Sequence, residues 1–502
     1  MYRPAHHSPP GLRPGTGRRG LGAQARPDRP PAEGRGTHPR TPRPGRGGGR
    51  GGGGAGAARL PDVPLSDHRG RHHPDPAERR RRAHPRPAPG LTAATQRGSE
   101  MMKAYIVGVG MTKFEKPETR DWSYGDMVRE AGTAALEDAG VRYDQVEQVP
   151  VGYCFQPSTA GQRAVYGLGL TGVPVYNVNN NCATGSTALM LARQFVAGGG
   201  SDCVLAVGLE KMARGSLGGS SGSGGGSGGG DFAASPVARH YGIMAAAHGF
   251  TDAPPTAQIF GNAAREHMER YGTTPAQLAA VGAKNHRHSV NNPYAQFQDP
   301  YTVEEVLASR TVHAPLTKLQ CSPTSDGAAA AVVVSERFVE RHGLGERAVE
   351  IAAQAMTTDT EASFASGTCI DAVGTPMSRA AARQVYAASG LGPGDLDVIE
   401  LHDCFSVNEL LTYEALGLCG EGESGKLVES GATTYGGRWV VNPSGGLISK
   451  GHPLGATGIA QAAELTWQLR GEAGPRQVPG ARTGLAHNIG LGGAAVVTLL
   501  RR

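Results

Sequence analysis

The 502-residue sequence is poor in aromatic side chains, which make up 5% of the chain, and it contains no long apolar run. No segment approaches the roughly 20 apolar residues of a membrane-spanning helix, so we expect no membrane association. The seven cysteines include no Cys-x-x-Cys pair, and we therefore predict no metal site of the zinc or iron–sulfur kind. An odd, scattered set of cysteines without an export signal predicts reduced thiols inside a cell, in a cytoplasmic protein.

Lysine is missing from residues 1–100, which contain 20 arginines and seven acidic residues. Arginine, proline and glycine dominate this leader, which has too little apolar surface to offset the chain entropy lost on folding, so we predict disorder. Arg/Gly segments can bind RNA, but the lack of lysine points to GC-rich coding sequence. We interpret the leader as a mis-assigned extension before a true start at Met101 or Met102. It lacks the apolar centre of a secretory signal.

The remaining residues carry 30 basic and 37 acidic side chains, a balance that gives no indication of a nucleic-acid partner. The chain ends in "LLRR", which is not a peroxisomal targeting tripeptide. The length exceeds a single simple core, so we expect two or three domains.

Short apolar runs alternate with amphipathic helical segments from Lys103 onward. The runs predict strands at "AYIVGVG", "CVLAVGLEKM", "VEIAAQAM" and "LDVIELHDCF", and the helical segments include "MVREAGTAALEDAG", closed by Gly140, and "SRAAARQVYAASG". This alternation predicts an α/β protein with a parallel-type core.

An internal repeat relates Ala183–Gly199 to Ala456–Gly471, and each copy is followed by an apolar strand. Duplication would place the two helix starts beside a shared crevice. We predict one half from residues 101–212 plus 321–345, a second half at 346–502, and an inserted loop domain at 213–320. That loop domain holds a flexible Gly/Ser run at 216–230. It also holds the polar "KNHRHSVNNPYAQFQDP", whose His286 and His288 we interpret as a surface loop, not as metal ligands.

A lone cysteine stands behind three asparagines in "NNNCATGSTALMLARQ", at the start of the first repeat copy. The pattern predicts that Cys182 lies in the first turn of a helix. Most free cysteines are small buried hydrophobic residues. A helix N-terminus also favours a thiolate, so a nucleophile is the alternative interpretation.

Three later stretches offer partners for this thiol. "ELHDCFSVNE" places His402 and Cys404 at the end of a strand, although a His/Asp pair that caps the next helix would look the same. "SGGLISKGHPLGATG" places His452 before a helix, where an ordinary loop histidine is the alternative. "HNIGLGG" offers backbone N–H groups at Asn488 to Gly490 that suit an oxyanion, although such turns are common. A thiol, a nearby base and a second thiol together suit acyl transfer and the making or breaking of a carbon–carbon bond.

The motifs "NNNCATGS", "HDCFSVNELLTYEALGL" and "NPSGGLISKGHPLGATG" resemble those of thiolases, in particular the sterol carrier protein X type, which includes bacterial lipid-transfer proteins and acetyl-CoA acetyltransferases. The resemblance runs from about Lys103 to Leu500. It implies a duplicated five-layer α/β/α/β/α fold with an inserted loop domain, and a homodimer.

The resemblance also implies roles for single residues. Cys182 becomes acylated, His452 activates it, and Cys404 replaces the second cysteine that most thiolases carry in a late Cys-x-Gly motif. His402 replaces the oxyanion-binding asparagine of most thiolases. The implied oxyanion-hole residues are Cys182, Gly490, His402 and His452, and the implied substrate-binding residues are Asn488, Ser444 and Gly445.

The implied activity is that of a 3-oxoacyl-CoA thiolase in fatty-acid or sterol side-chain degradation. Coenzyme A and acyl-CoA are its substrates, and we expect no permanently bound cofactor. One alternative is a retro-aldolase that cleaves steroid side chains with a small partner protein and does not rely on paired thiols. A decarboxylating ketosynthase would have no use for Cys404, and a lipid carrier without turnover would need none of the four residues.

Overall fold

The computed structural model describes residues 102–213 and 235–502. The predicted disordered leader at 1–100 and the predicted flexible run at 216–230 lie outside the described residues, and the domain boundaries remain predictions. Among the described residues, no helix combines the length and apolar character needed to cross a bilayer.

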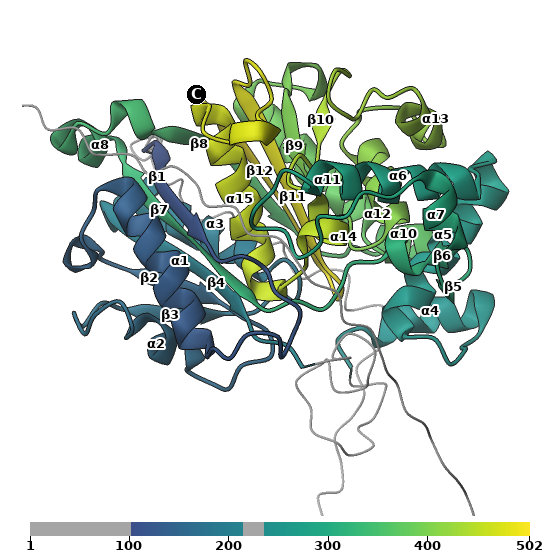
Figure 1. Ribbon diagram of the computed structural model, residues 1–502, viewed down its shortest axis with the longest axis horizontal. Helices are drawn as coiled ribbons and strands as arrows, with labels where there is room; N and C mark the ends of the chain where they lie inside the picture. Colours follow the sequence, from purple (N-terminus) through teal and green to yellow (C-terminus); the bar gives the residue numbers. More distant parts are fainter. Residues whose placement is uncertain (1–101, 214–234) are drawn as a thin grey trace, which may run out of the picture. The chain divides into compact units, whose positions relative to one another are not determined.

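One ten-stranded sheet organises the described chain (Figure 1). In order across the sheet its strands are β10 (Val440–Val441), β9 (Val398–Glu400), β11 (Thr483–Gly490), β12 (Ala494–Arg501), β8 (Val349–Thr357), β1 (Ala104–Met111), β7 (Gly327–Ser335), β4 (Cys203–Glu210), β2 (Val149–Gly152) and β3 (Val175–Val178). The two halves of the sheet join only where Tyr105 and Ile106 of β1 pair with Glu350 and Val349 of β8.

The prediction of a parallel-type core holds only for the outer parts of the sheet. β10, β9 and β11 pair in parallel, as do β3, β2 and β4. The strands between them, β12, β8, β1 and β7, form antiparallel ladders with their neighbours. A fully buried apolar run such as that of β4 looks the same in either ladder, so the composition of a strand could not distinguish them.

The two halves of the sheet are two of the layers. Helices form three further layers, which agrees with the predicted five-layer order. α3 (Thr184–Ala197) and α15 (Leu454–Arg470) share one buried cluster with strands of both halves and so lie between them. α1 (Tyr124–Ala139) and α2 (Ala160–Val165) cover the free face of one half. α11 (Thr375–Ser389) and α12 (Ser406–Ala415) cover the free face of the other.

The two helices of the internal repeat cross at very short range near their N-termini. A Cβ on Gly185 of α3 would stand 2.6 Å from the carbonyl oxygen of Gly455, and a Cβ on Gly458 would stand 2.3 Å from the backbone nitrogen of Ser186. Only glycine permits this approach. The crossing brings the two helix starts together, as the repeat predicts.

The predicted loop domain contains α4 (Ala238–His248), α5 (Pro255–Tyr271), α6 (Pro275–Ser289) and α7 (Val303–Ala308), with the short pair β5 (Thr311–His313) and β6 (Leu316–Thr317). The remaining α-helices are short: α8 (Glu336–His342), α9 (Ala362–Ala365), α10 (Cys369–Ala372), α13 (Ser424–Glu429) and α14 (Gly446–Lys450).

The prediction that His286 and His288 belong to a surface loop is wrong. Both lie in α6 and are 2% and 3% exposed. His288 is hydrogen-bonded to the carbonyl oxygen of Asn442 (3.0 Å) and the hydroxyl of Thr434 (2.7 Å), and His286 pairs with Ser449 (3.1 Å). Burial lowers the pKa of His286 to about 4 and that of His288 to about 3. These polar side chains can be buried because protein groups make the hydrogen bonds that water would otherwise make.

Candidate active site

The three asparagines before Cys182 form a tight turn after β3. Asn181 has a positive φ of 51°, and its side-chain nitrogen donates to the carbonyl oxygen of Leu491 (2.9 Å), which ties this turn to the one between β11 and β12. The hydroxyl of Thr184 accepts from the backbone of Asn180 (2.8 Å). Cys182 directly precedes the N-cap residue Ala183, so it lies just outside α3 and not in its first turn as predicted.

Three of the four predicted catalytic side chains converge. The sulfur of Cys182 and ring nitrogens of His402 and His452 all lie within 4.8 Å of one another. His402 follows β9, and His452 precedes α15, so the sheet and the central helix layer each contribute an imidazole. The two rings meet edge to face, with centroids 5.1 Å apart.

The hydrogen bonds of His452 determine which of its nitrogens carries the proton. The hydroxyl of Thr457 donates to the carbonyl oxygen of Pro453 (3.0 Å), and its oxygen lies 2.8 Å from Nδ1 of His452. Since the hydroxyl proton is already used, Thr457 can only accept from His452, and Nδ1 must carry the hydrogen. Nε2 then has a free lone pair, and it is buried without a hydrogen-bond partner. His452 is therefore arranged as a proton acceptor.

His402 takes the opposite tautomer. Gln461 donates through Nε2 to the carbonyl oxygen of His487 (3.1 Å), which leaves its Oε1 as an acceptor for Asn488 Nδ2 (3.4 Å). The same Nδ2 lies 3.1 Å from Nδ1 of His402 and must be the donor, so the hydrogen of His402 is on Nε2. His402 is therefore arranged as a hydrogen-bond donor, and Asn488, predicted to bind substrate, is fully buried and positions it.

Cys404 is also buried, and it stands two positions after His402. It is 6% exposed, and its backbone carbonyl accepts from Ser322 (2.9 Å). Burial is the first cause of a pKa well above the usual range for Cys404, and the nearby Cys182 is the second. The sulfur of Cys404 does not belong to the set of atoms that lie within 4.8 Å of one another, so its place beside Cys182 stays a prediction.

Burial disfavours the charged form of each side chain in this cluster. Burial, and then the nearby carboxyl of Glu210, raise the pKa of Cys182 to about 12. Burial lowers the pKa of His452 to about 3, with Lys450 as a further cause, and lowers the pKa of His402 well below its usual value. The expectation that the helix N-terminus favours a thiolate at Cys182 is therefore wrong, because burial raises the pKa of the thiol instead of lowering it.

Gly490 lies against the turn that carries Cys182. A Cβ at this position would stand 2.1 Å from the carbonyl oxygen of Asn180 and 3.2 Å from the backbone nitrogen of Ala183. The end of β11 and the cysteine turn thus touch backbone to backbone. This contact agrees with the predicted placement of the Cys182 and Gly490 N–H groups near each other.

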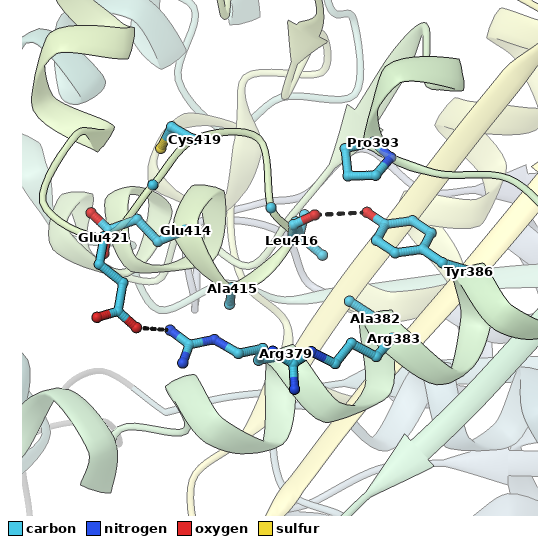
Figure 2. Close-up of a pocket in the computed structure, with 12 residues that line it drawn as sticks. Arg379, Ala382, Arg383, Tyr386, Pro393, Glu414, Ala415, Leu416, Cys419 and Glu421 are labelled. Carbon is cyan, nitrogen blue, oxygen red and sulfur yellow. Dashed lines mark hydrogen bonds and ion pairs between the residues drawn. The ribbon is translucent and has the colours of Figure 1, made fainter.

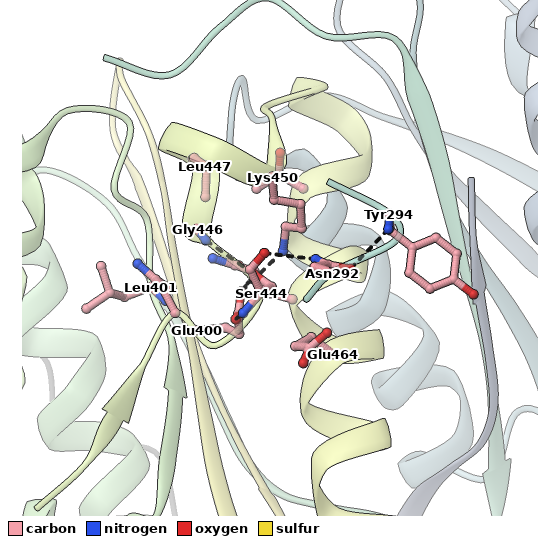
Figure 3. A network of polar contacts seen from close by, with 12 residues as sticks. Asn292, Tyr294, Glu400, Leu401, Ser444, Gly446, Leu447, Lys450 and Glu464 are labelled. Carbon is pink, nitrogen blue, oxygen red and sulfur yellow. Dashed lines mark hydrogen bonds and ion pairs between the residues drawn. The ribbon is translucent and has the colours of Figure 1, made fainter. Parts of the chain in front are cut away.

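Ser444 and Gly445, predicted to bind substrate, are instead enclosed in protein. Ser444 is fully buried, and its backbone nitrogen (3.0 Å) and hydroxyl (2.7 Å) both donate to Glu400. Lys450 is ion-paired with the same carboxylate at 3.2 Å (Figure 3). A Cβ on Gly445 would stand 2.4 Å from the Cβ of Ser289. These contacts hold the start of α14 and leave no surface at Ser444 for a substrate.

Two carboxyls support the site: sequence patterns missed Glu210, and they offered Asp403 only as a possible cap of the next helix, α12, whereas it caps α14. Glu210 accepts from the backbone nitrogens of Cys154, Phe155 and Gly455 at 3.0, 2.9 and 3.0 Å, which ties the start of α15 to the segment after β2. Asp403, between His402 and Cys404, accepts from Leu447 and Ile448 at the start of α14 and from Asn285 of α6. Both have acceptor roles toward residues distant in sequence, which no local motif reveals.

A surface cavity of about 390 Å³ lies apart from this cluster, between α11 and the segment that follows α12 (Figure 2). Arg379, Arg383, Tyr386 and Cys419 are among its lining residues, and Arg379 is ion-paired with Glu421 at 2.6 Å. None of the four predicted catalytic residues lines it. The cavity is therefore separate from the thiol–imidazole cluster.

Two family profiles match the chain. The profile described as "Thiolase, N-terminal domain" matches residues 104–337, and the one described as "Thiolase C-terminal domain-like" matches residues 362–502. A protein named "Sterol carrier protein 2" from Bos taurus is 58% identical over 400 residues, which cover 80% of this chain and 72% of that protein.

A protein named "Acetyl-CoA acetyltransferase" from Methanothermobacter thermautotrophicus is 40% identical over 408 residues, 80% of this chain and all of that protein. Among solved structures, one titled "Ltp2-ChsH2(DUF35) aldolase" superposes with a TM-score of 0.64 and 25% identity, over 80% of this chain and 97% of that one.

Proposed function

The chain belongs to the thiolase family, and on that premise we propose that it is a 3-oxoacyl-CoA thiolase. The observation that carries the proposal is the convergence of Cys182, His402 and His452 within 4.8 Å, with the two imidazoles in opposite tautomers. One ring can accept a proton and the other can donate a hydrogen bond. Acyl transfer through a thioester needs both functions.

In the first half-reaction, Nε2 of His452 removes the proton of Cys182 as the sulfur attacks the 3-oxo carbon. Since the resting thiol and imidazole are both neutral, proton transfer accompanies the attack and does not precede it. The Nε2–H of His402 donates to the oxygen that becomes negative. The carbon–carbon bond then breaks, Cys182 keeps the shortened acyl group, and acetyl-CoA or propionyl-CoA leaves as a carbanion.

Cys404 protonates that carbanion and becomes the thiolate. In the second half-reaction it takes a proton from the thiol of coenzyme A, whose sulfur attacks the Cys182 thioester. The products are two acyl-CoA molecules, and each protein proton returns to its original atom. Operation in reverse is a Claisen condensation of the two thioesters.

Coenzyme A acts here as a substrate, and no permanently bound cofactor is required. The similarity to sterol carrier protein 2 supports a role in fatty-acid or sterol side-chain degradation. The four catalytic residues do not determine which acyl chain is preferred; other parts of the chain do.

The working form is proposed to be a homodimer. β3 is an edge strand of the sheet, and the residues around it expose apolar side chains. Leu170 is 82% exposed, and Tyr166 and Tyr176 are also exposed large hydrophobic residues. An uncovered edge with apolar neighbours favours association with a second copy.

A second candidate is retro-aldol cleavage of a steroid side chain with a small partner protein, which the similarity to the Ltp2-ChsH2(DUF35) aldolase supports. Such a reaction has no acyl-enzyme and does not need Cys182 and Cys404 as a pair. A third is lipid transfer without turnover, which the relative's name suggests. The presence of both thiols and two oriented imidazoles favours thiolysis over either.

The test is thiolysis of acetoacetyl-CoA and of a longer 3-oxoacyl-CoA by wild type, Cys182→Ala and Cys404→Ala. We expect losses of about three orders of magnitude or more in kcat for both variants. Cys419→Ala, which removes a thiol outside the cluster, is the matched control and should retain the wild-type rate. Full turnover by Cys182→Ala would refute the proposal. Activity that requires a second protein, and that releases propionyl-CoA without free coenzyme A, would establish the aldolase instead.

A further inference from the structure

A second cluster of ligand-type side chains lies outside the proposed active site. His248 at the end of α4, Glu266 on α5 and Cys369 at the start of α10 place an imidazole nitrogen, a carboxylate oxygen and a sulfur within 4.8 Å of one another. The three helices pack against each other on the same side of the described chain (Figure 1).

The carboxylate is the centre of the cluster. Nε2 of His248 lies 3.0 Å from Oε1 of Glu266. The backbone nitrogen of Cys369 donates to the same oxygen at 3.0 Å, and that of Ile370 donates to the other oxygen at 3.1 Å. The two backbone contacts are sufficient to cap α10. The imidazole and the thiol are not needed for that cap, yet a ring nitrogen of His248 and the sulfur of Cys369 both lie within 4.8 Å of a carboxylate oxygen of Glu266.

Burial and access both suit a bound ion. Cys369 has no exposed surface, while the side chains of His248 and Glu266 are 17% and 15% exposed.

We propose that His248, Glu266 and Cys369 form a binding site for a zinc-like divalent cation. Zn²⁺ binds thiolate, imidazole and carboxylate ligands together. Mg²⁺ and Ca²⁺ prefer oxygen ligands and would bind weakly to such a set. On binding, Cys369 releases its proton, and His248 binds through Nε2 with its hydrogen on Nδ1. Water supplies the fourth ligand at the exposed side, and the N–H of Cys369 continues to support the carboxylate.

The ligands stand 18 and 103 positions apart, which is why a search for closely spaced cysteines predicts no metal site. The ion would join α4 to α10. A Cβ on Gly492 would stand 3.5 Å from the side chain of Val237, the N-cap residue of α4, so this helix starts beside the turn between β11 and β12 that Asn181 also contacts. Binding would thus fix a helix that borders the active site.

The test must exclude the active-site thiol, because Cys182, His402 and His452 meet the same distance criterion. Co²⁺ is therefore added to the full-length Cys182→Ala protein, and the near-ultraviolet absorption that arises only from a sulfur–cobalt bond is recorded. Residues 1–100 contain seven histidines but no cysteine, so they cannot produce this absorption. The comparison adds Cys369→Ser, His248→Gln or Cys419→Ser to that background.

We expect one sulfur-bound Co²⁺ per chain in Cys182→Ala and in Cys182→Ala/Cys419→Ser. The absorption should disappear in Cys182→Ala/Cys369→Ser, and His248→Gln should weaken Co²⁺ binding at least about tenfold. Zn²⁺ should displace Co²⁺ and raise the unfolding temperature only where Cys369 is present. Circular dichroism verifies that each variant is folded. No sulfur–cobalt absorption in Cys182→Ala, or unchanged absorption after the loss of Cys369, would overturn the proposal without touching the thiolase assignment.

Discussion

The imidazoles of His402 and His452 lie edge to face, with planes at 86° and centroids 5.1 Å apart. Their outer hydrogen bonds require opposite tautomers, because Thr457 accepts from one ring and Asn488 donates to the other. Two chemically identical side chains therefore have different hydrogen-bonding roles beside one sulfur. In the proposed reaction, His452 takes the thiol proton and His402 binds the developing oxyanion.

Loss of the Thr457 hydroxyl should weaken the base. In Thr457→Val, Nδ1–H of His452 has no acceptor in a buried site, a loss of about 1–3 kcal/mol. We expect kcat for thiolysis to fall about 10-fold or more while KM changes little. Thr457→Ser retains the hydroxyl and should keep most of the rate. Equal losses in the two variants would argue against the hydrogen bond as the cause.

Asn488→Asp should reverse the tautomer of His402. A carboxylate accepts the hydrogen on Nδ1, so Nε2 loses the proton that binds the oxyanion, and the rate should fall about 10²-fold. The new charge also raises the pKa of His402. Below that pKa both nitrogens carry protons, so the activity of Asn488→Asp should recover as the pH falls. Asn488→Ala is the control, since it loses rate without this recovery. A parallel pH profile in the two variants would contradict the tautomer assignment.

Glu210 should make stability depend on pH. Burial raises its folded pKa from 4.5 to about 7, although three backbone N–H groups oppose the shift. The folded protein then holds a proton that the unfolded chain releases, so stability falls as the pH rises from about 4.5 to 7. The slope is about 1.4 kcal/mol per pH unit and the total about 3 kcal/mol. Denaturant unfolding of Glu210→Gln should lack this component. An identical pH dependence in wild type and variant would show that Glu210 does not titrate in this range.

Local patterns predicted much of the fold. The apolar runs at β1 and β4 and the helix α1, which ends at Gly140 with a φ of 66°, occur where their sequences place them. The repeat correctly indicated that α3 and α15 start side by side, because their glycines permit close contact. Ladder direction could not be predicted, since it depends on which distant strand supplies the partner.

The motifs predicted which residues form the candidate site. Their protonation states depend on burial, which the motifs do not show. The convergence of His402 and His452 on Cys182 was expected from the thiolase resemblance. The protonation state was not, because the pKa of Cys182 depends on burial that the sequence does not report. His286 and His288 were misplaced for the same reason, since their polar partners belong to segments more than 140 residues away. Thr457 stands only five positions after His452, but its role depends on the direction of its hydrogen bonds, and Asp403 acts through residues 44 to 118 positions away.

An acyl-enzyme at Cys182 can be detected by identifying the residue that carries the acyl group. The full-length protein is mixed with a 3-oxoacyl-CoA in the absence of free coenzyme A, quenched in acid and analysed by peptide mass spectrometry. We expect an acyl thioester on the peptide that contains Cys182, and we expect this thioester to disappear when coenzyme A is added before the quench. Product release with no acylated peptide, or acylation of a different residue, would contradict this expectation.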